Sequence, residues 1–448
     1  MWKPLLVAIA IASSLILQAA GQDSQDAWEA SLHQLLYTPY NNKLPALDAK
    51  VWSTFSPTPG VLADRVTYTT ASDMLVTAIV YRPDPKLLKG ALKGKGKLPA
   101  IVIVNGHGSD KFGWYAFYSG IMFAKAGAVV ITYDPIGEGE RNARKASAES
   151  PASHDADVLP PAPIPHDDWS QRLAGLMQVD LSQAISYLRA QPEVDTKRIG
   201  VASYSMGSYV TGLATAMDYY DHRIAAVVLS GGGTYDDVEG GYFDLNKSIC
   251  QAGAYRSLFP WLKLKGQPAR GEILYALIAS SQHPMLIMNG EQDTVMDIPH
   301  HNAAWFQELH DRTMKDFGLQ PSQMFETIFY PGISHRTSWV NRDGVEWLNS
   351  QLHFPFWKTN AIIEGQGTTH VSTWAQANNV WISKNYIRED REGGLDAVGT
   401  GLPGIPRAQL MVLPDADWQR MKDRLTYESW AAKTMAAEQA AAEKLRVH

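Results

Sequence analysis

The chain has 448 residues, of which 45% are hydrophobic and 19% are charged, a composition typical of a folded globular protein. This composition excludes an intrinsically disordered or fibrous chain. The formal net charge is −6 at pH 7, and the main lysine cluster, Lys89 to Lys97, is interleaved with glycine. Without a broad basic surface, no binding to nucleic acid is expected. The single cysteine, Cys250, excludes an intrachain disulfide and argues against a cysteine-based zinc cluster.

Residues 1–21 have the pattern of an export signal. Lys3 supplies a positive charge, an apolar stretch runs from Leu5 to Leu17, and small residues end at Gly21, where we expect cleavage. The apolar stretch is shorter than a comfortable membrane span, and no later segment reaches the roughly 18 apolar residues that a span needs. We therefore expect a secreted or periplasmic bacterial protein with no membrane span in the mature chain. An uncleaved anchor helix is the alternative.

The next segments predict an α/β domain. Residues 22–64 carry a weak helical pattern and are expected to form a packing arm. From residue 65 onward, short apolar runs are typical of strands in a sheet, and the first two resemble an antiparallel hairpin. The eight predicted strands are Arg65–Thr70, Leu75–Tyr81, Ala100–Val104, Ala128–Tyr133, Arg198–Ala202, Ala225–Leu229, Met285–Met288 and Glu326–Tyr330. Helical stretches such as 117–126 and 173–190 separate several of them, so we expect a mostly parallel eight-stranded sheet with helices on both faces.

Two insertions and a C-terminal extension surround this alternation. Residues 137–170 are rich in proline and lack a clean period, which predicts a long ordered loop or lid. Residues 231–283, between the sixth and seventh strands, are expected to form a cap over the strand ends. The catalytic domain is thus predicted over residues 65–355. The extension, residues 356–448, is predicted to hold short β segments at 380–382 and 409–412 and one long helix from 415 to 446.

The strongest local motif is Ser203-Tyr204-Ser205-Met206-Gly207, which follows a predicted strand and precedes a run of small residues. A serine at such a strand-to-helix turn exposes its hydroxyl near a helix N-terminus. A nucleophilic serine also needs a base and a carboxylate that orients the base. Asp293 and His335 each follow a predicted strand, so we expect them at the same carboxyl edge of the sheet as Ser205.

The loop after the strand Ala100–Val104 supplies the remaining part of the predicted site. It reads Asn105-Gly106-His107-Gly108-Ser109, and its glycines allow backbone N–H groups to point at a developing oxyanion. We expect the N–H groups of His107 and Met206 to form this oxyanion hole. In that arrangement the His107 side chain need not be the base.

These segments together resemble α/β-hydrolases of the acetyl xylan esterase, dienelactone hydrolase and prolyl oligopeptidase type. The resemblance covers about residues 65–355 and rests on residues 105–108, Asp134 to Gly139, the approach from Asp195 into Ser205, Gly290 to Asp293, and His335-Arg336. The order Ser, Asp, His along the chain is the order of that superfamily. Two positions depart from the usual pattern: Asn105 stands where the loop usually has His, and Ser203 where the turn usually has Gly. The resemblance implies hydrolysis of carboxylic esters or peptide bonds without a cofactor.

Other residues compete for these roles. Ser230 also lies between a strand and glycines, but the residues after it do not look helical. Glu291 and Asp297 are near enough in sequence to compete with Asp293. A metal site is not predicted, because adjacent histidines on a helix point to different sides; the histidines concerned are His300, His301 and His310.

Trp114 and Trp339 lie a few residues from proposed catalytic loops and are candidates for stacking on a sugar ring, with packing as the alternative. We therefore expect a secreted serine hydrolase that cleaves carboxylic esters, with a small-molecule or carbohydrate ester such as an acetylated sugar as substrate. A prolyl oligopeptidase-like peptidase is the first alternative, although residues 22–64 are too short for the propeller of those enzymes. A non-catalytic binding protein on a hydrolase scaffold is the second alternative.

Overall fold

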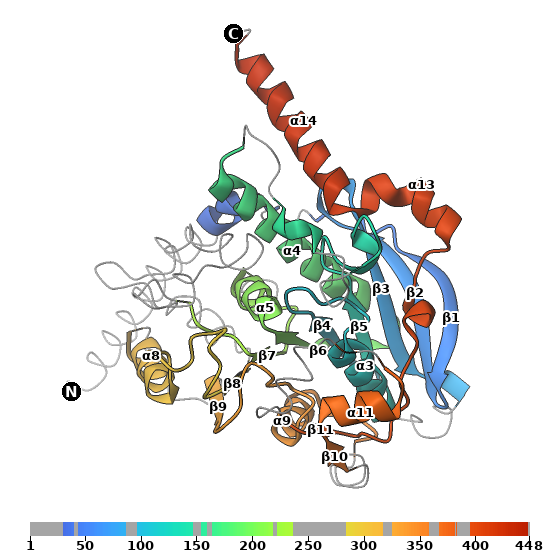
Figure 1. Cartoon of the computed structure of the whole chain (residues 1–448), viewed down its shortest axis with the longest axis vertical. Helices are drawn as coiled ribbons and strands as arrows, with labels where there is room; N and C mark the ends of the chain where they lie inside the picture. Colours follow the sequence, from blue (N-terminus) through green and yellow to red (C-terminus); the bar gives the residue numbers. More distant parts are fainter. Residues whose placement is uncertain are drawn as a thin grey trace, which may run out of the picture.

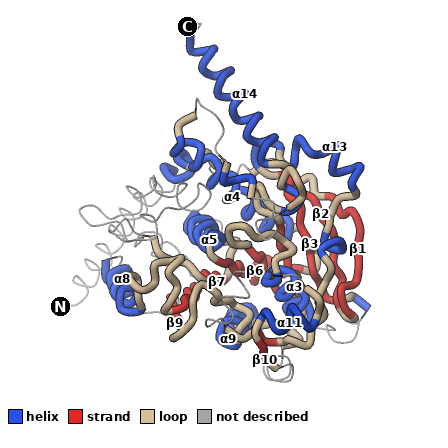
Figure 2. The backbone as a smooth tube through the Cα atoms, viewed as in Figure 1, coloured by secondary structure: helices blue, strands red, loops and turns tan. Residues whose placement is uncertain are grey.

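The computed structural model describes residues 30–39, 44–86, 96–146, 154–158, 164–217, 222–235, 284–316, 325–357, 367–380, 382 and 395–446. In this part of the chain a nine-stranded sheet runs through the molecule, with helices on both of its faces (Figure 1, Figure 2). The strands are β1 Lys50–Thr58, β2 Val61–Thr69, β3 Leu75–Pro83, β4 Leu98–Val104, β5 Val129–Tyr133, β6 Val194–Tyr204, β7 Ala226–Ser230, β8 Met285–Gly290 and β9 Phe325–Tyr330. Their order is β1-β2-β3-β5-β4-β6-β7-β8-β9.

The sheet confirms the predicted fold class. The strands β5, β4, β6, β7, β8 and β9 are parallel, and β1, β2 and β3 join them through antiparallel pairs. The described sheet has one strand more than the eight expected, because β1 lies inside the predicted arm. It was missed because most of its side chains are exposed at the sheet edge, so the segment has no buried apolar run. The predicted boundary at residue 65 also falls within β2.

Helices cover the two faces of the sheet and bury two separate core clusters. The helices are α3 Trp114–Ala126, α4 His166–Arg189, α5 Met206–Met217, α8 Ala303–Asp316, α9 Arg342–Leu352, α11 Val371–Ala377, α13 Asp415–Leu425 and α14 Tyr427–Arg446. Along β4, Val102 and Val104 enter the cluster under α4, α5 and α8, whereas Ile101 and Ile103 enter the cluster under α3 and α9. This alternation explains why the strand is apolar at every position.

The C-terminal extension packs on both faces of the sheet: α11 and α13 contribute to the core cluster under α3, whereas α14 packs against α4, with the rings of Trp430 and Trp169 4.7 Å apart. Trp374 of α11 contacts Tyr118 at a ring-centroid distance of 4.9 Å, and the Tyr118 hydroxyl donates to the Val398 carbonyl at 2.6 Å. The predicted long terminal helix is wrong as one element, because Thr426 has extended backbone angles and separates α13 from α14. The predicted β segments at 380–382 and 409–412 are not strands among the described residues. A short antiparallel pair forms instead between β10 (Thr368–Thr369) and β11 (Ala397–Val398).

Several sequence predictions fall outside the described residues. These are the export signal at residues 1–21 and most of the second insertion, from 236 to 283, which contains Cys250. The described part of the first insertion contains two short 3₁₀ helices, Gly139–Arg141 and Asp155–Asp157, and the start of α4. Among the helices that the structure describes, none has both the length and the apolar character needed to cross a bilayer.

Candidate active site

Ser205 occupies a sharp turn between β6, which ends at Tyr204, and α5, which begins at Met206. Its φ angle is +54°, in the left-handed region that non-glycine residues rarely adopt. The turn packs tightly on the end of β4, because a Cβ atom at Gly207 would lie 2.5 Å from the Val104 carbonyl oxygen. The strained turn therefore has the geometry of a nucleophile elbow, and it requires glycine at position 207.

The three residues predicted to act together are joined by hydrogen bonds. Ser205 Oγ lies 3.0 Å from Nε2 of His335, and Nδ1 of the same ring lies 2.7 Å from Oδ2 of Asp293. Ser205 is 5% exposed, His335 is 7% exposed and Asp293 is fully buried. Asp293 follows β8 and His335 follows β9, so all three side chains meet at the carboxyl edge of the parallel strands. This chain of contacts can carry a proton away from the serine hydroxyl.

Asp293 and His335 are each held by the backbone around them. The second carboxylate oxygen of Asp293, Oδ1, accepts hydrogen bonds from the N–H groups of Val295 at 2.9 Å and Met296 at 3.0 Å. The loop that carries His335 lies directly on the end of β8, because a Cβ atom at Gly290 would be 2.2 Å from the Ser334 carbonyl oxygen. These contacts fix the carboxylate and the imidazole before any substrate binds.

Two residues that sequence reasoning missed reinforce this arrangement. The Tyr204 hydroxyl donates to the carbonyl oxygen of His335 and accepts from Nη1 of Arg336. The rings of Tyr204 and His335 lie 5.2 Å apart. The signal was present in the sequence, since Tyr204 directly precedes Ser205 and Arg336 directly follows His335.

Both predicted oxyanion donors belong to segments next to Ser205. Met206 is the first residue of α5, so its N–H has no acceptor one turn earlier in that helix. The His107 loop packs against the elbow, because a Cβ atom at Gly106 would lie 3.1 Å from Cβ of Ser205. The structure explains why Asn stands at position 105 in place of the usual His. Its Nδ2 donates a hydrogen bond to the Tyr133 carbonyl at 3.2 Å, which holds the loop against β5.

The competing residues have other contacts. Ser230 is fully buried and donates to Oγ1 of Thr337 at 3.2 Å, while its carbonyl accepts the N–H of Ser205 at 2.9 Å. Asp297 contacts Nδ1 of His300 at 2.6 Å and Nδ1 of the neighbouring His301 at 3.5 Å. Glu291 is exposed. Among the three candidate carboxylates, Asp293 is the one that forms a hydrogen bond with His335 in the described part of the chain.

The prediction that Trp339 stacks on a sugar ring is wrong. Its side chain is 0% exposed, and its ring packs 5.7 Å from that of Tyr115 inside the core under α3 and α9. Trp114 begins α3, and its side chain lies outside the described part of the structure.

Buried charges hold the loop after β5. Lys111 is fully buried and contacts the carboxylates of Asp134 and, at 2.8 Å, Glu140. Burial by itself would lower the pKa of Lys111, but attraction to Asp134, Glu140 and Asp110 outweighs it and raises that pKa above its ordinary value. Lys111 therefore carries a charge at neutral pH and neutralises part of the acidic cluster beneath the His107 loop.

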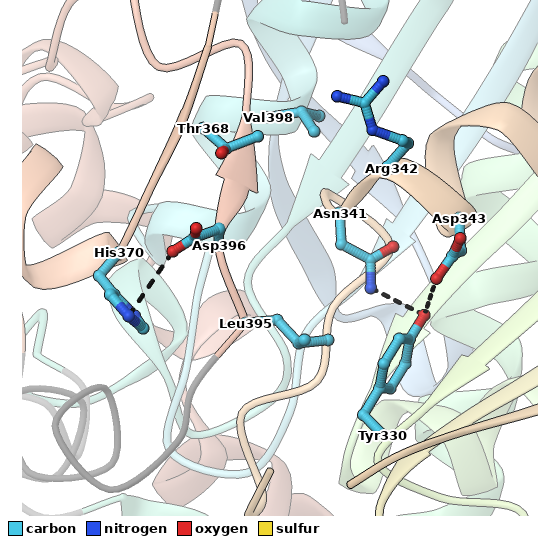
Figure 3. Close-up of a pocket in the computed structure, with 9 residues that line it drawn as sticks. All are labelled: Tyr330, Asn341, Arg342, Asp343, Thr368, His370, Leu395, Asp396 and Val398. Atoms are coloured by element: carbon cyan, nitrogen blue, oxygen red, sulfur yellow. Dashed lines mark hydrogen bonds and ion pairs between the residues drawn. The ribbon is translucent and has the colours of Figure 1, made fainter. Parts of the chain in front are cut away.

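A hollow of about 380 Å³ opens beside the loop that carries His335 (Figure 3). Figure 3 shows the side chains of Asn341 and Asp343 converging on the Tyr330 hydroxyl, with N···O and O···O distances of 2.9 Å. A smaller space that shares Asn341 with it reaches Arg336. The hollow is lined by Tyr330, Asn341, Arg342, Asp343, Thr368, His370, Leu395, Asp396 and Val398. Sequence reasoning missed it because the C-terminal extension supplies five of these nine residues.

Comparisons with known proteins agree with this geometry. The family model "Prolyl oligopeptidase family" matches residues 166–361, a segment that contains Ser205, Asp293 and His335. No curated protein sequence matches the chain. Among solved structures, the chain is similar to the protein titled "Methylesterase BT1017", with a TM-score of 0.53, 16% identity, and coverage of 95% of this chain and 76% of the other.

Two acetyl xylan esterases are also similar. The enzyme from Thermoanaerobacterium sp. JW/SL YS485 has a TM-score of 0.46, 17% identity, and coverage of 75% of this chain and 94% of the other. The enzyme from Paenibacillus sp. R4 has a TM-score of 0.48, 16% identity, and coverage of 73% and 94%. The strand order, the family match and the likeness to the methylesterase structure together show that the chain has the α/β-hydrolase fold.

Proposed function

We propose that the protein is a serine hydrolase that cleaves carboxylic esters through an acyl-enzyme. The observation that carries the proposal is the hydrogen-bonded chain from Ser205 Oγ through the His335 ring to the fully buried Asp293. The strained backbone of Ser205 supports the same role, because left-handed non-glycine residues concentrate at functional sites. The export pattern of residues 1–21 makes a secreted or periplasmic enzyme part of the proposal.

The proposed mechanism uses each of these atoms. Ser205 Oγ attacks the ester carbonyl carbon while Nε2 of His335 accepts the hydroxyl proton, and Asp293 stabilises the resulting imidazolium. The tetrahedral oxyanion accepts hydrogen bonds from the N–H groups of His107 and Met206. His335 then protonates the departing alcohol, which leaves an acyl group on Ser205. A water molecule gives a proton to His335 and attacks the acyl carbon. His335 then returns this proton to Ser205 Oγ as the bond between Oγ and the acyl carbon breaks and the carboxylic acid leaves.

The polar hollow beside the loop that carries His335 favours a carbohydrate ester as substrate. It combines hydroxyl, amide, guanidinium, imidazole and carboxylate groups, which can donate to and accept from sugar hydroxyls. Its volume lies within the usual range of small-molecule sites. We propose that the sugar portion of the ester extends from Ser205 toward Arg342 and Asp396.

A peptidase is the second candidate function, and the prolyl oligopeptidase family match favours it. The same catalytic residues would serve either reaction, so the substrate must be decided by experiment. The rate on p-nitrophenyl acetate should exceed the rate on a proline-containing peptide anilide. A faster rate on the anilide would overturn the esterase assignment in favour of the peptidase.

The nucleophile is tested with matched serine variants. Ser205→Ala should abolish ester turnover and labelling by a fluorophosphonate, whereas Ser230→Ala removes an equally buried hydroxyl from the same region and should keep both. Turnover that survives in Ser205→Ala would contradict the proposed nucleophile. A wild-type protein that forms no fluorophosphonate adduct and cleaves no ester would support a non-catalytic scaffold instead. A panel of acetyl, feruloyl and methyl-glucuronoyl esters would then define the acyl group and the alcohol.

A further inference from the structure

Arg407, from the C-terminal extension, reaches the loop that contains His107. Its Nη2 donates to Oδ2 of Asp110 at 3.0 Å, and the Asp110 side chain is 0% exposed. The Arg407 guanidinium also lies over the Phe112 ring, with its central carbon 3.8 Å from the ring centroid. Arg407 and Asp110 are 297 positions apart in the chain, so no sequence motif could indicate this pair. One side chain of the extension therefore holds two residues that follow His107.

Asp110 belongs to the same run of turns as the proposed oxyanion donor. The N–H of Ser109 donates to the carbonyl of Gly106 at 3.1 Å, which closes a turn around His107. Asp110 stabilises the next turn, because its Oδ1 accepts the N–H of Phe112 at 2.8 Å. The two turns are consecutive, so a shift of the Asp110 carboxylate is passed to the backbone that carries the His107 N–H.

The buried Asp110 depends on Arg407 to remain charged. Burial is the largest influence on the pKa of Asp110 and raises it above its ordinary value, while Arg407 exerts the largest opposing influence. Asp134 adds to the rise, and Lys111 and the Phe112 N–H oppose it. A buried carboxylate that loses its cation is disfavoured, so it moves or takes up a proton. Either change weakens the hydrogen bond that stabilises the turn after His107.

Arg407 is itself held on a fixed part of the extension. It begins the short 3₁₀ helix Arg407–Leu410, directly after Pro406, and Leu410 is 1% exposed. The carbonyl of Gln409 in this helix accepts a hydrogen bond from Nη2 of Arg65 on β2 at 2.8 Å. The Arg407 side chain is 41% exposed, so a substitution there leaves no cavity in the core.

We propose that Arg407 is a positioning residue of the hydrolase, which fixes the backbone of the His107 loop through its ion pair with Asp110. This inference rests on the proposed ester chemistry, and Arg407 acts through the loop and not by contact with the substrate. The His107 N–H is expected to bind the oxyanion, so a displaced loop weakens binding of the transition state more than binding of the ground state. The expected mark of this role is a lower kcat with little change in KM.

The test compares three properties of Arg407→Met with those of the wild type. We expect kcat for p-nitrophenyl acetate to fall about tenfold, which is part of the loss of about 10²- to 10³-fold caused by removing one oxyanion donor. KM should stay within about twofold of the wild-type value. The Ki of a boronic acid that forms a tetrahedral adduct with Ser205 should rise by the same factor as kcat falls. Arg407→Lys keeps a cation beside Asp110 but loses the planar fork, so its kcat should recover to about threefold below wild type.

Arg424→Met is the matched control. Arg424 is another arginine of the extension that pairs with an aspartate of the catalytic half, since its Nη2 lies 2.6 Å from Oδ1 of Asp73. Its kcat and its boronate Ki should stay within about twofold of the wild-type values. An equal loss of kcat in Arg424→Met and Arg407→Met would reduce the effect to general attachment of the extension and would overturn the proposal.

A double variant separates loop position from stability. Asp110→Asn combined with Arg407→Met removes the unpaired buried charge, so its Tm should recover toward the wild-type value. Its kcat should stay about tenfold low, because the contact with the extension is still absent. A kcat that recovers together with Tm, or a wild-type kcat in Arg407→Met, would overturn the positioning role and leave the ester chemistry intact. A wild-type protein that neither cleaves the ester nor binds the boronic acid would overturn the ester chemistry and this role with it.

Discussion

Replacing Asp293 by Asn tests the proposed proton path with almost no change in shape. In the wild type, Oδ1 of Asp293 accepts two backbone N–H groups, and Oδ2 faces Nδ1 of His335 at 2.7 Å. The asparagine carbonyl must take the position of Oδ1, because the N–H groups of Val295 and Met296 both need an acceptor. Its NH₂ group is then forced to face His335.

This orientation reverses the hydrogen bond to the imidazole. The amide donates to Nδ1, so the ring proton moves to Nε2, which then points a donor at Ser205 Oγ and cannot accept its proton. We expect kcat for p-nitrophenyl acetate to fall about 10⁴-fold, as in other serine hydrolases with this change. That loss corresponds to about 5 kcal/mol of transition-state stabilisation, at about 1.4 kcal/mol for each tenfold step.

The matched control is Glu291→Gln, which makes the same chemical change at an exposed position of the same loop. Its kcat should stay within about twofold of the wild-type value, because surface substitutions of this kind have small effects. Both variants should unfold cooperatively near the wild-type Tm. If Asp293→Asn keeps kcat within tenfold of the wild type, Asp293 does not orient the base and the proposed triad is refuted.

Three further substitutions test the support and the specificity of the site. Lys111→Met should lower the free energy of unfolding, measured by urea denaturation, by about 3 to 5 kcal/mol, because it leaves Asp134 and Glu140 buried without their cation. A loss below about 1 kcal/mol would contradict this expectation. Gly207→Ala should cost about 1 to 3 kcal/mol and lower kcat, because the added methyl group meets β4 backbone; unchanged Tm and kcat would argue against a tight elbow. Arg342→Ala should raise KM about tenfold for an acetylated oligosaccharide, since it removes a charged hydrogen-bond donor, and should leave KM for p-nitrophenyl acetate unchanged. An equal change in KM for both substrates would show that the hollow does not bind the sugar.

The sequence predicted the parallel part of the sheet well because those strands are buried on both faces. A strand such as β4 must then be apolar at every position, and its ends are marked by glycine or polar residues. The same logic pointed to Ser205, Asp293 and His335, because each lies in the turn or loop that follows a strand of the parallel part of the sheet. β1 gave no comparable signal, since its exposed side chains at the sheet edge leave the pattern mixed.

The features that sequence reasoning missed depend on contacts between distant segments. Trp339 looked available for a sugar because it lies close to His335 along the chain, but its ring fills the core. The break at Thr426 carries no proline or glycine that would mark the end of a helix. Periodicity cannot report such tertiary contacts.

The C-terminal extension is joined to the catalytic half at two places that matter for the site. The Glu140 carboxylate accepts the N–H groups of Val412 and Leu413, both at 2.8 Å, and the Trp418 indole donates to the Glu140 carbonyl. Glu140 also contacts Lys111, which lies just after the His107 loop, so the extension helps to fix the segment expected to hold the oxyanion. The same extension supplies five of the nine residues that line the hollow beside the loop that carries His335. Residues that the proposed ester chemistry does not require thus hold the loop that contains His107 and shape the hollow proposed to bind the sugar.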